Sequence, residues 1–198
     1  YAWFGWIIAF AVHLKVLRLH EGRDEPPLEW LHAAGFWLLA VVLSWETGWQ
    51  IDHFVAGRHV WPLIAWALAP GALITLFAAR GAGIGWPVRT HRHAYLYMGA
   101  LPLVVFLLGW ILFTTFASNG DPAPLPYVPL VNPLDLAQAG ALLAVATWFI
   151  GVRRLDLPQA TLPPANDALK VLGVIVFIAL NGVLLRTLHH YAGVPFRL

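Results

Sequence analysis

The sequence has no cysteine and few charged residues. Without cysteine there can be no disulfide framework, no thiolate zinc site and no cysteine nucleophile. Charged residues make up 11% of the 198 residues and hydrophobic residues 60%, whereas soluble domains are roughly 25% charged and 45–50% apolar. A soluble globule of this length could not hide so much apolar surface from water. The low charge therefore excludes an ordinary soluble domain.

The sequence also lacks the common signatures of nucleotide, metal and acyl chemistry. It contains no phosphate loop, no dinucleotide fingerprint, no HExxH and no GxSxG. Its net charge is +2 and its basic residues are spread over short loops, so nucleic acid is not an expected partner. His13 and His32 lie near segment ends without a haem attachment motif. We therefore predict no cofactor and no metal site.

Long apolar runs are what the sequence does contain. A hydrocarbon core of ~30 Å is crossed by about twenty apolar residues in a helix. The runs are continuous and do not alternate with period two, which excludes a barrel. We predict an all-α polytopic membrane bundle of about six transmembrane helices, forming a single domain over residues 1–198. The expected segments are 1–19, 28–51, 60–79, 94–117, 134–151 and 168–190.

The distribution of Lys and Arg predicts the orientation of these segments. Nine of these residues lie near the first, third and fifth loops, and three lie near the other ends. Because basic residues favour the cytoplasmic side, we expect the amino end, the second and fourth loops and the carboxyl end to face outward. The histidines of the "THRH" stretch then lie on the cytoplasmic side, where contact with lipid headgroups explains them most simply.

A carboxylate interrupts the second apolar segment, in "SWETGWQIDHF". Glu46, Gln50 and His53 share one helical face, because they are spaced four and then three residues apart. An intramembrane carboxylate is expensive unless it is paired or lines a wet cavity, so Glu46 is a candidate functional residue. Trp49 lies on a neighbouring face and could stack on a sugar, although interfacial anchoring explains most tryptophans near segment ends. The structural alternative makes Glu46 the buried partner of a basic group.

Three basic side chains lie at the end of the sixth segment. Arg186, His189 and His190 project from one side of the helix. We predict an ion pair that joins Glu46 to Arg186 or His190 across the second and sixth segments. The structural alternative is that these cations only complement the negative pole of the helix dipole, with Arg186 reaching the headgroups.

The fifth segment begins with a capping pattern, "NPLDLAQ". Asn132 fits the N-cap position, Pro133 the first helical position and Asp135 the third position, where an acid satisfies free N–H groups. Capping alone accounts for Asp135, so a role in a functional site would come in addition to its capping role.

By the predicted orientation, all these polar groups lie on the outward side, which suggests one hydrated pocket. The candidate catalytic residues are Glu46, Arg186, His189 and His190, and the candidate substrate-binding residues are Trp49, Gln50, His53 and Asp135.

Three functions are compatible with such a pocket. The first is an envelope enzyme that acts on a lipid-linked or glycan substrate, with Glu46 or a histidine as general base and Arg186 holding an anionic group. The second is a transporter or channel module with a proton or ion relay. The third is a non-catalytic membrane scaffold in which polar clusters hold the helices together.

Three stretches carry a resemblance to a known family: "NPLDLAQAGALLA", "LNGVLLRTLHHYAGVPF" and, more loosely, "WLHAAGFWLLAVVLSWETGWQID". They are similar to a bacterial family of predicted multi-spanning membrane proteins known as domain of unknown function 2339. The resemblance implies a bacterial inner-membrane location and supplies no activity. Members of that family are much longer, so we expect this chain to be part of a longer protein. Its expected partners are membrane lipids, the remaining spans and a lipid-linked or anionic small substrate.

Overall fold

The computed structural model is all-helical and describes residues 2–22, 27–55, 60–81, 83–155, 157 and 160–196. Its elements are α1 (Ala2–Leu19), α2 (Pro27–Phe54), α3 (Trp61–Arg80), the π-helical turn η1 (Ala94–Gly99), α4 (Ala100–Ala117), α5 (Pro133–Leu155) and α6 (Ala165–Ala192). The predicted helices are confirmed. Helix α5 extends beyond the predicted end at residue 151 because Arg153 and Arg154 complete its last turn, where cations are favourable.

Five of the described helical segments are long and apolar enough to cross a membrane: α2, α3, η1 with α4, α5 and α6. The chain is therefore a multi-pass membrane helical bundle. The first predicted span is a helix, α1, but it is not among these five. Its second half carries His13, Lys15 and Arg18, which interrupt its apolar surface.

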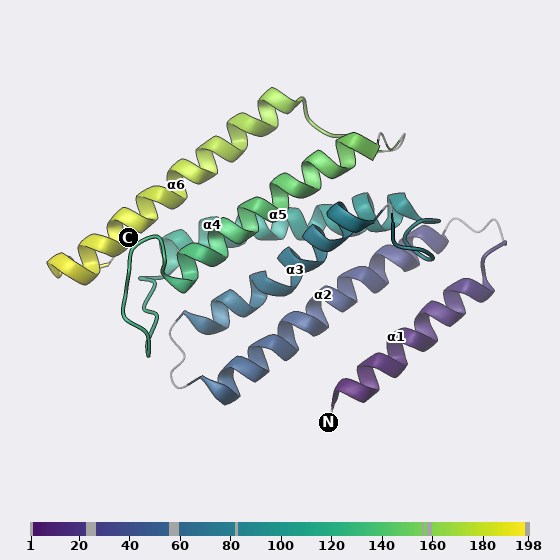
Figure 1. The fold of residues 1–198 in the computed structure, drawn as a ribbon, viewed down its shortest axis with the longest axis horizontal. Coiled ribbons are helices and arrows are strands. Elements are labelled where there is room, and N and C mark those ends of the chain that lie inside the picture. Colours follow the sequence, from purple (N-terminus) through teal and green to yellow (C-terminus); the bar gives the residue numbers. More distant parts are fainter. Residues whose placement is uncertain are drawn as a thin grey trace.

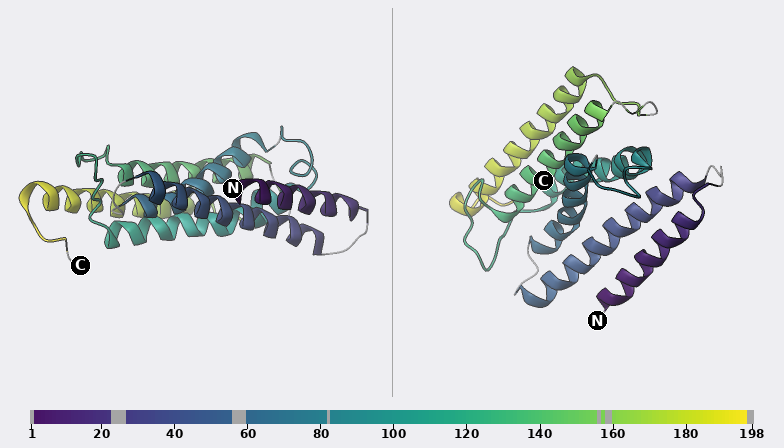
Figure 2. Two further views of the ribbon diagram at one scale, coloured as in Figure 1. Left: turned by 90° about the horizontal axis from the view of Figure 1, so that it is seen from below. Right: turned by 45° about the vertical axis from the view of Figure 1, so that its right-hand side comes forward.

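Helix α3 lies in the middle of the bundle and packs against α2, α4 and α5. Helix α6 packs on α4 and α5, and α1 packs on α2, so that α1 and α6 lie at opposite edges (Figures 1 and 2). The side chains between α3, α4 and α5 are apolar, including the completely buried Ile74, Leu107 and Ile111. In this order α2 and α6 lie on opposite sides of the central helices (Figure 1).

One buried tryptophan, Trp148, and one half-buried tryptophan, Trp37, connect the helices through their indole N–H groups. Trp148 on α5 donates to the carbonyl oxygen of Leu96 at 2.7 Å, and Trp37 on α2 donates to that of Gly99 at 3.0 Å. Both acceptors belong to η1. A buried indole needs such a partner because its N–H is otherwise unsatisfied. These tryptophans therefore fix α2 and α5 to the beginning of the fourth span.

Candidate functional site

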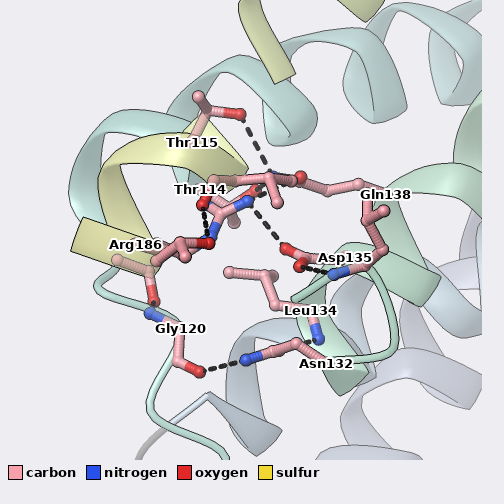
Figure 3. Close-up of polar contacts among 12 residues, drawn as sticks. Thr114, Thr115, Gly120, Asn132, Leu134, Asp135, Gln138 and Arg186 are labelled. Carbon is pink, nitrogen blue, oxygen red and sulfur yellow. Dashed lines mark hydrogen bonds and ion pairs between the residues drawn. The ribbon is translucent and has the colours of Figure 1, made fainter. Parts of the chain in front are cut away.

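The described residues include one completely buried arginine, Arg186 on α6, which has 0% of its surface exposed. It lies among polar side chains from three helices at the end of the bundle that the sequence predicts to face outward. We call this set the Arg186 cluster. It consists of Thr114 and Thr115 on α4, Asp135 and Gln138 on α5, and Arg186 on α6 (Figure 3).

The carboxylate of Asp135 is the charged partner of Arg186. Nη2 of Arg186 donates to Oδ1 of Asp135 at 2.8 Å and to Oε1 of Gln138 at 3.3 Å. Both charged side chains are buried, so neither charge is screened by water. The pair therefore ties α6 to α5 inside the protein.

The two threonines orient the amide of Gln138. Nε2 of Gln138 donates to Oγ1 of Thr114 at 2.9 Å and to Oγ1 of Thr115 at 3.1 Å. The threonine hydroxyls in turn donate to carbonyl oxygens one turn back in α4. The amide nitrogen is thus held toward α4, and its oxygen is left facing the guanidinium of Arg186.

The beginning of α5 confirms the predicted N-cap. Oδ1 of Asn132 accepts the backbone N–H of Leu134 at 2.7 Å, and Nδ2 of Asn132 donates to the carbonyl oxygen of Gly120 at 2.6 Å. Pro133 takes the first helical position. The capping explanation of Asp135 needs correction, because its second oxygen accepts the N–H of Leu130 in the preceding loop, at 3.1 Å, while the first binds Arg186.

Two glycines make room for the arginine and its helix. Gly120 has φ +70°, and a Cβ there would lie 2.6 Å from Cδ of Arg186. A Cβ on Gly182 would lie 2.5 Å from Cγ2 of Thr115. Both distances are shorter than van der Waals contact. The close approach of α6 and of the 118–132 loop to the cluster therefore depends on glycine at these positions.

The histidines at the end of α6 contact the 118–132 loop. Nε2 of His190 donates to the carbonyl oxygen of Asn119 at 3.0 Å, and its ring stacks on Tyr127 with the centroids 4.1 Å apart. Nδ2 of Asn119 donates to Nε2 of His189 at 3.4 Å, while Nδ1 of His189 donates to the carbonyl oxygen of Val194, just after α6, at 2.8 Å. The hydroxyl of Tyr191 donates to the carbonyl oxygen of Tyr127 at 3.0 Å. These contacts hold the loop against the end of the helix.

The predicted pair between Glu46 and Arg186 or His190 is wrong. Arg186 binds Asp135, and α2 and α6 lie on opposite sides of the central helices (Figure 1). Glu46 is 9% exposed, and within the described ranges its carboxylate has no hydrogen-bond partner. Glu46 therefore does not belong to the Arg186 cluster.

The other α2 residues also lie apart from the cluster. Trp49 and His53 stack with their rings 5.2 Å apart, and both side chains are exposed. Gln50 is half-buried on the same helix. Of the predicted site residues, the structure brings Asp135 and Arg186 together, and places His189 and His190 next to them in contact with the loop. The predicted residues of α2 lie elsewhere.

Three residues of the cluster were missed in the sequence: Thr114, Thr115 and Gln138. A signal was present, since Gln138 follows Asp135 by three residues and therefore shares its helical face. The threonine pair interrupts the apolar fourth segment in the stretch "FTTF". Polar residues inside a span that share a depth with Arg186 are the expected partners of such a charge.

Not all donors of the arginine are satisfied. Nε and Nη1 of Arg186 and the hydroxyl of Tyr127 are buried, and none has a hydrogen-bond partner in the described part of the chain. Burial raises the pKa of Tyr127, so this phenol stays neutral and can donate. The cluster therefore offers hydrogen-bond donors for a water molecule or an anionic group, and only one carboxylate for a cation.

At the opposite end of the bundle, the histidines of "THRH" bind carboxylates. Nε2 of His91 lies 3.0 Å from Oε1 of Glu21, and Nδ1 of His93 lies 3.0 Å from Oε2 of Glu29. The side chain of His91 is only 13% exposed. Contact with lipid headgroups therefore does not explain these two residues.

Comparison with known proteins gives a family and no characterised relative. No curated protein and no solved structure matches the chain. A family model described as "Predicted membrane protein (DUF2339)" matches residues 1–197, which is almost the entire chain. This match agrees with the multi-pass architecture and with the resemblance seen in the sequence. The protein therefore belongs to the DUF2339 family of predicted membrane proteins.

Proposed function

We propose that this chain is a non-catalytic helical scaffold of a bacterial inner-membrane protein. The observation that carries the proposal is the complete burial of Arg186 against Asp135, 2.8 Å apart. A guanidinium that holds a substrate has to be reachable from outside, whereas one that joins helices is enclosed. The function of the Arg186 cluster is then to keep α4, α5 and α6 in one arrangement.

The contacts around the cluster support the same function. The cap formed by Asn132 and the contacts of His190 and Tyr191 hold the 118–132 loop in place. Polar side chains that join helices are worth about 0.6 kcal/mol each on average in membranes, so several together are needed to fix a loop and three helices. The partners of this scaffold are membrane lipids along its exposed apolar faces and further spans of a longer chain.

An ion or proton relay finds no support in the middle of the bundle. Between the Arg186 cluster and the histidines at the opposite end, the described core residues of α3, α4 and α5 are apolar, including Leu103, Leu107 and Val145. A relay needs successive groups that can exchange protons, and these side chains have none.

An envelope enzyme is the second candidate function, and the unpaired donors of Arg186 favour it. Nε and Nη1 of Arg186, with the hydroxyl of Tyr127, could hold the anionic group of a lipid-linked or glycan substrate. This function requires the 118–132 loop to open, because the cluster is buried when the loop is in place.

An apolar replacement of the ion pair separates the two functions. Asp135→Leu with Arg186→Met removes both charges and keeps two large side chains; replacing a buried pair in this way is often neutral or stabilising, whereas breaking it costs about 3–5 kcal/mol. If the chain is a scaffold, the double variant should therefore keep the thermal stability of the wild type in detergent. It should also complement a strain from which the protein has been deleted. Each single substitution should fail in both measurements. A stable double variant that does not restore the phenotype would contradict the scaffold and support the enzyme.

A further inference from the structure

Two histidines and a glutamate from three separate segments meet at the end of the bundle opposite the Arg186 cluster. They are Glu21 after α1, His32 in the first turns of α2 and His91 before η1. Each offers a ligand atom, and these atoms lie within 4.8 Å of one another. Because the three residues are far apart in the sequence, no spacing motif reveals them.

The free nitrogen of His32 is the most informative feature of this group. Its side chain has 0% exposure, and Nε2 has no hydrogen-bond partner among the residues that the structure places. Nδ1 lies 3.0 Å from the hydroxyl of Tyr95. A histidine that binds a metal ion typically uses one nitrogen for the ion and the other for a hydrogen bond that fixes the ring. His32 has this arrangement.

The other two side chains are also held in place. The rings of His32 and His91 stack with their centroids 4.1 Å apart. Oε1 of Glu21 lies 3.0 Å from Nε2 of His91 and also accepts the indole N–H of Trp86. These contacts fix both side chains next to the unpaired nitrogen of His32.

We propose that Glu21, His32 and His91 form a binding site for a divalent transition-metal ion of the zinc type. Two imidazoles and one carboxylate are the protein ligands of many zinc sites that keep a fourth position for water. Ligand atoms around a tetrahedral zinc ion lie about 3.3 Å apart, from bond lengths of ~2.0 Å. The longest of the distances between these atoms would therefore have to shorten by up to about 1.5 Å. Because the rings of His32 and His91 are stacked, binding of one ion by both also requires their side chains to rotate.

The ion would also have a structural effect. It would join the α1–α2 connection, the beginning of α2 and the segment before η1. The contacts of these segments differ from those of the Arg186 cluster, so the site does not depend on the scaffold function proposed above.

Metal titration of the purified full-length protein in lipid nanodiscs tests the site. After treatment with a chelator, Zn²⁺ should bind with one tight site per chain that is lost in His32→Asn, His91→Asn and Glu21→Gln. His20→Asn and His93→Asn are the matched controls, because these histidines lie in the same region and outside the group; they should bind Zn²⁺ as the wild type does.

Tyr95→Phe provides a test that does not remove a ligand. The ring and its packing remain, and only the hydroxyl beside Nδ1 of His32 is lost, so Zn²⁺ affinity should fall by about 10- to 100-fold while the protein stays monodisperse. Replacing Zn²⁺ with Co²⁺ should give the visible absorption of a four-coordinate site. The proposal is overturned if the wild type binds neither ion, or if the ligand variants and the control variants bind equally well.

Discussion

The backbone of Gly182 on α6 lies directly against the side chain of Thr115 on α4: a Cβ at Gly182 would be 2.5 Å from Cγ2 of the threonine. Helices in membranes approach closely where small residues lie at their interface. Gly182 thus brings α6 near enough for Arg186, one turn further on, to reach α5.

Gly182→Ala should therefore weaken the contact between α4 and α6. The methyl group has to displace Thr115 or the helix, and overpacking of this kind costs about 1–3 kcal/mol. Gly173→Ala, on the same helix, is the matched control, because a Cβ there meets nothing within 4 Å. Thermal unfolding in detergent compares the two variants. Equal midpoints would show that the contact at Gly182 is not tight.

Asp135→Asn should destabilise the protein far more than Glu46→Gln. The first substitution leaves the buried charge of Arg186 without its partner, at a cost of about 3–5 kcal/mol. Glu46 has no hydrogen-bond partner among the described residues, so its neutralisation breaks no described contact. Denaturant unfolding of both variants measures the difference. A larger loss for Glu46→Gln would restore this residue as the partner of a buried cation.

His190→Ala should loosen the 118–132 loop and leave the helices in place. The variant loses the hydrogen bond to Asn119 and the stacking on Tyr127, together about 1–2 kcal/mol, or a factor of 5–30 in the equilibrium of loop opening. Amide hydrogen exchange in the loop should accelerate by that factor. His53→Ala, an exposed histidine at the same end of the bundle, should leave the exchange unchanged. Equal exchange in wild type and His190→Ala would mean that other contacts hold the loop.

The predicted orientation can be tested directly because the chain has no cysteine of its own. Single cysteines at Gly83 and Pro163 should be protected from an impermeant thiol reagent added outside intact cells, and a cysteine at Ala123 should react. Permeabilised cells, in which all three should react, are the control. The reversed pattern would place the Arg186 cluster on the cytoplasmic side and the proposed metal site outside.

The positions of the helices could be predicted from the sequence because a span is a local property. An apolar run of about twenty residues is readable from composition alone. The N-cap at Asn132 was readable for the same reason, since it depends only on the next few residues.

The partner of Arg186 could not be predicted, because it depends on which helices are neighbours. Helices α2, α4 and α6 are apolar on most sides, and a helix surrounded by lipid needs no polar face that would indicate its inner side. From depth, the sequence predicted Glu46 as the partner of the arginine, and Asp135 was explained by capping. The order of packing, with α3 between α2 and α5, decides in favour of Asp135.

The π-helical turn η1 sets the rotational phase of the entire fourth span. Compared with an α-helix, such a turn accommodates about one extra residue, and one residue corresponds to a rotation of about 100°. Thr114 and Thr115 lie about four turns beyond η1, so the direction in which they project toward Gln138 depends on this phase. An insertion or deletion within Ala94–Gly99 would therefore rotate Thr114 and Thr115 away from Gln138 at the other end of the fourth span. The two ends of this span are thus coupled through η1.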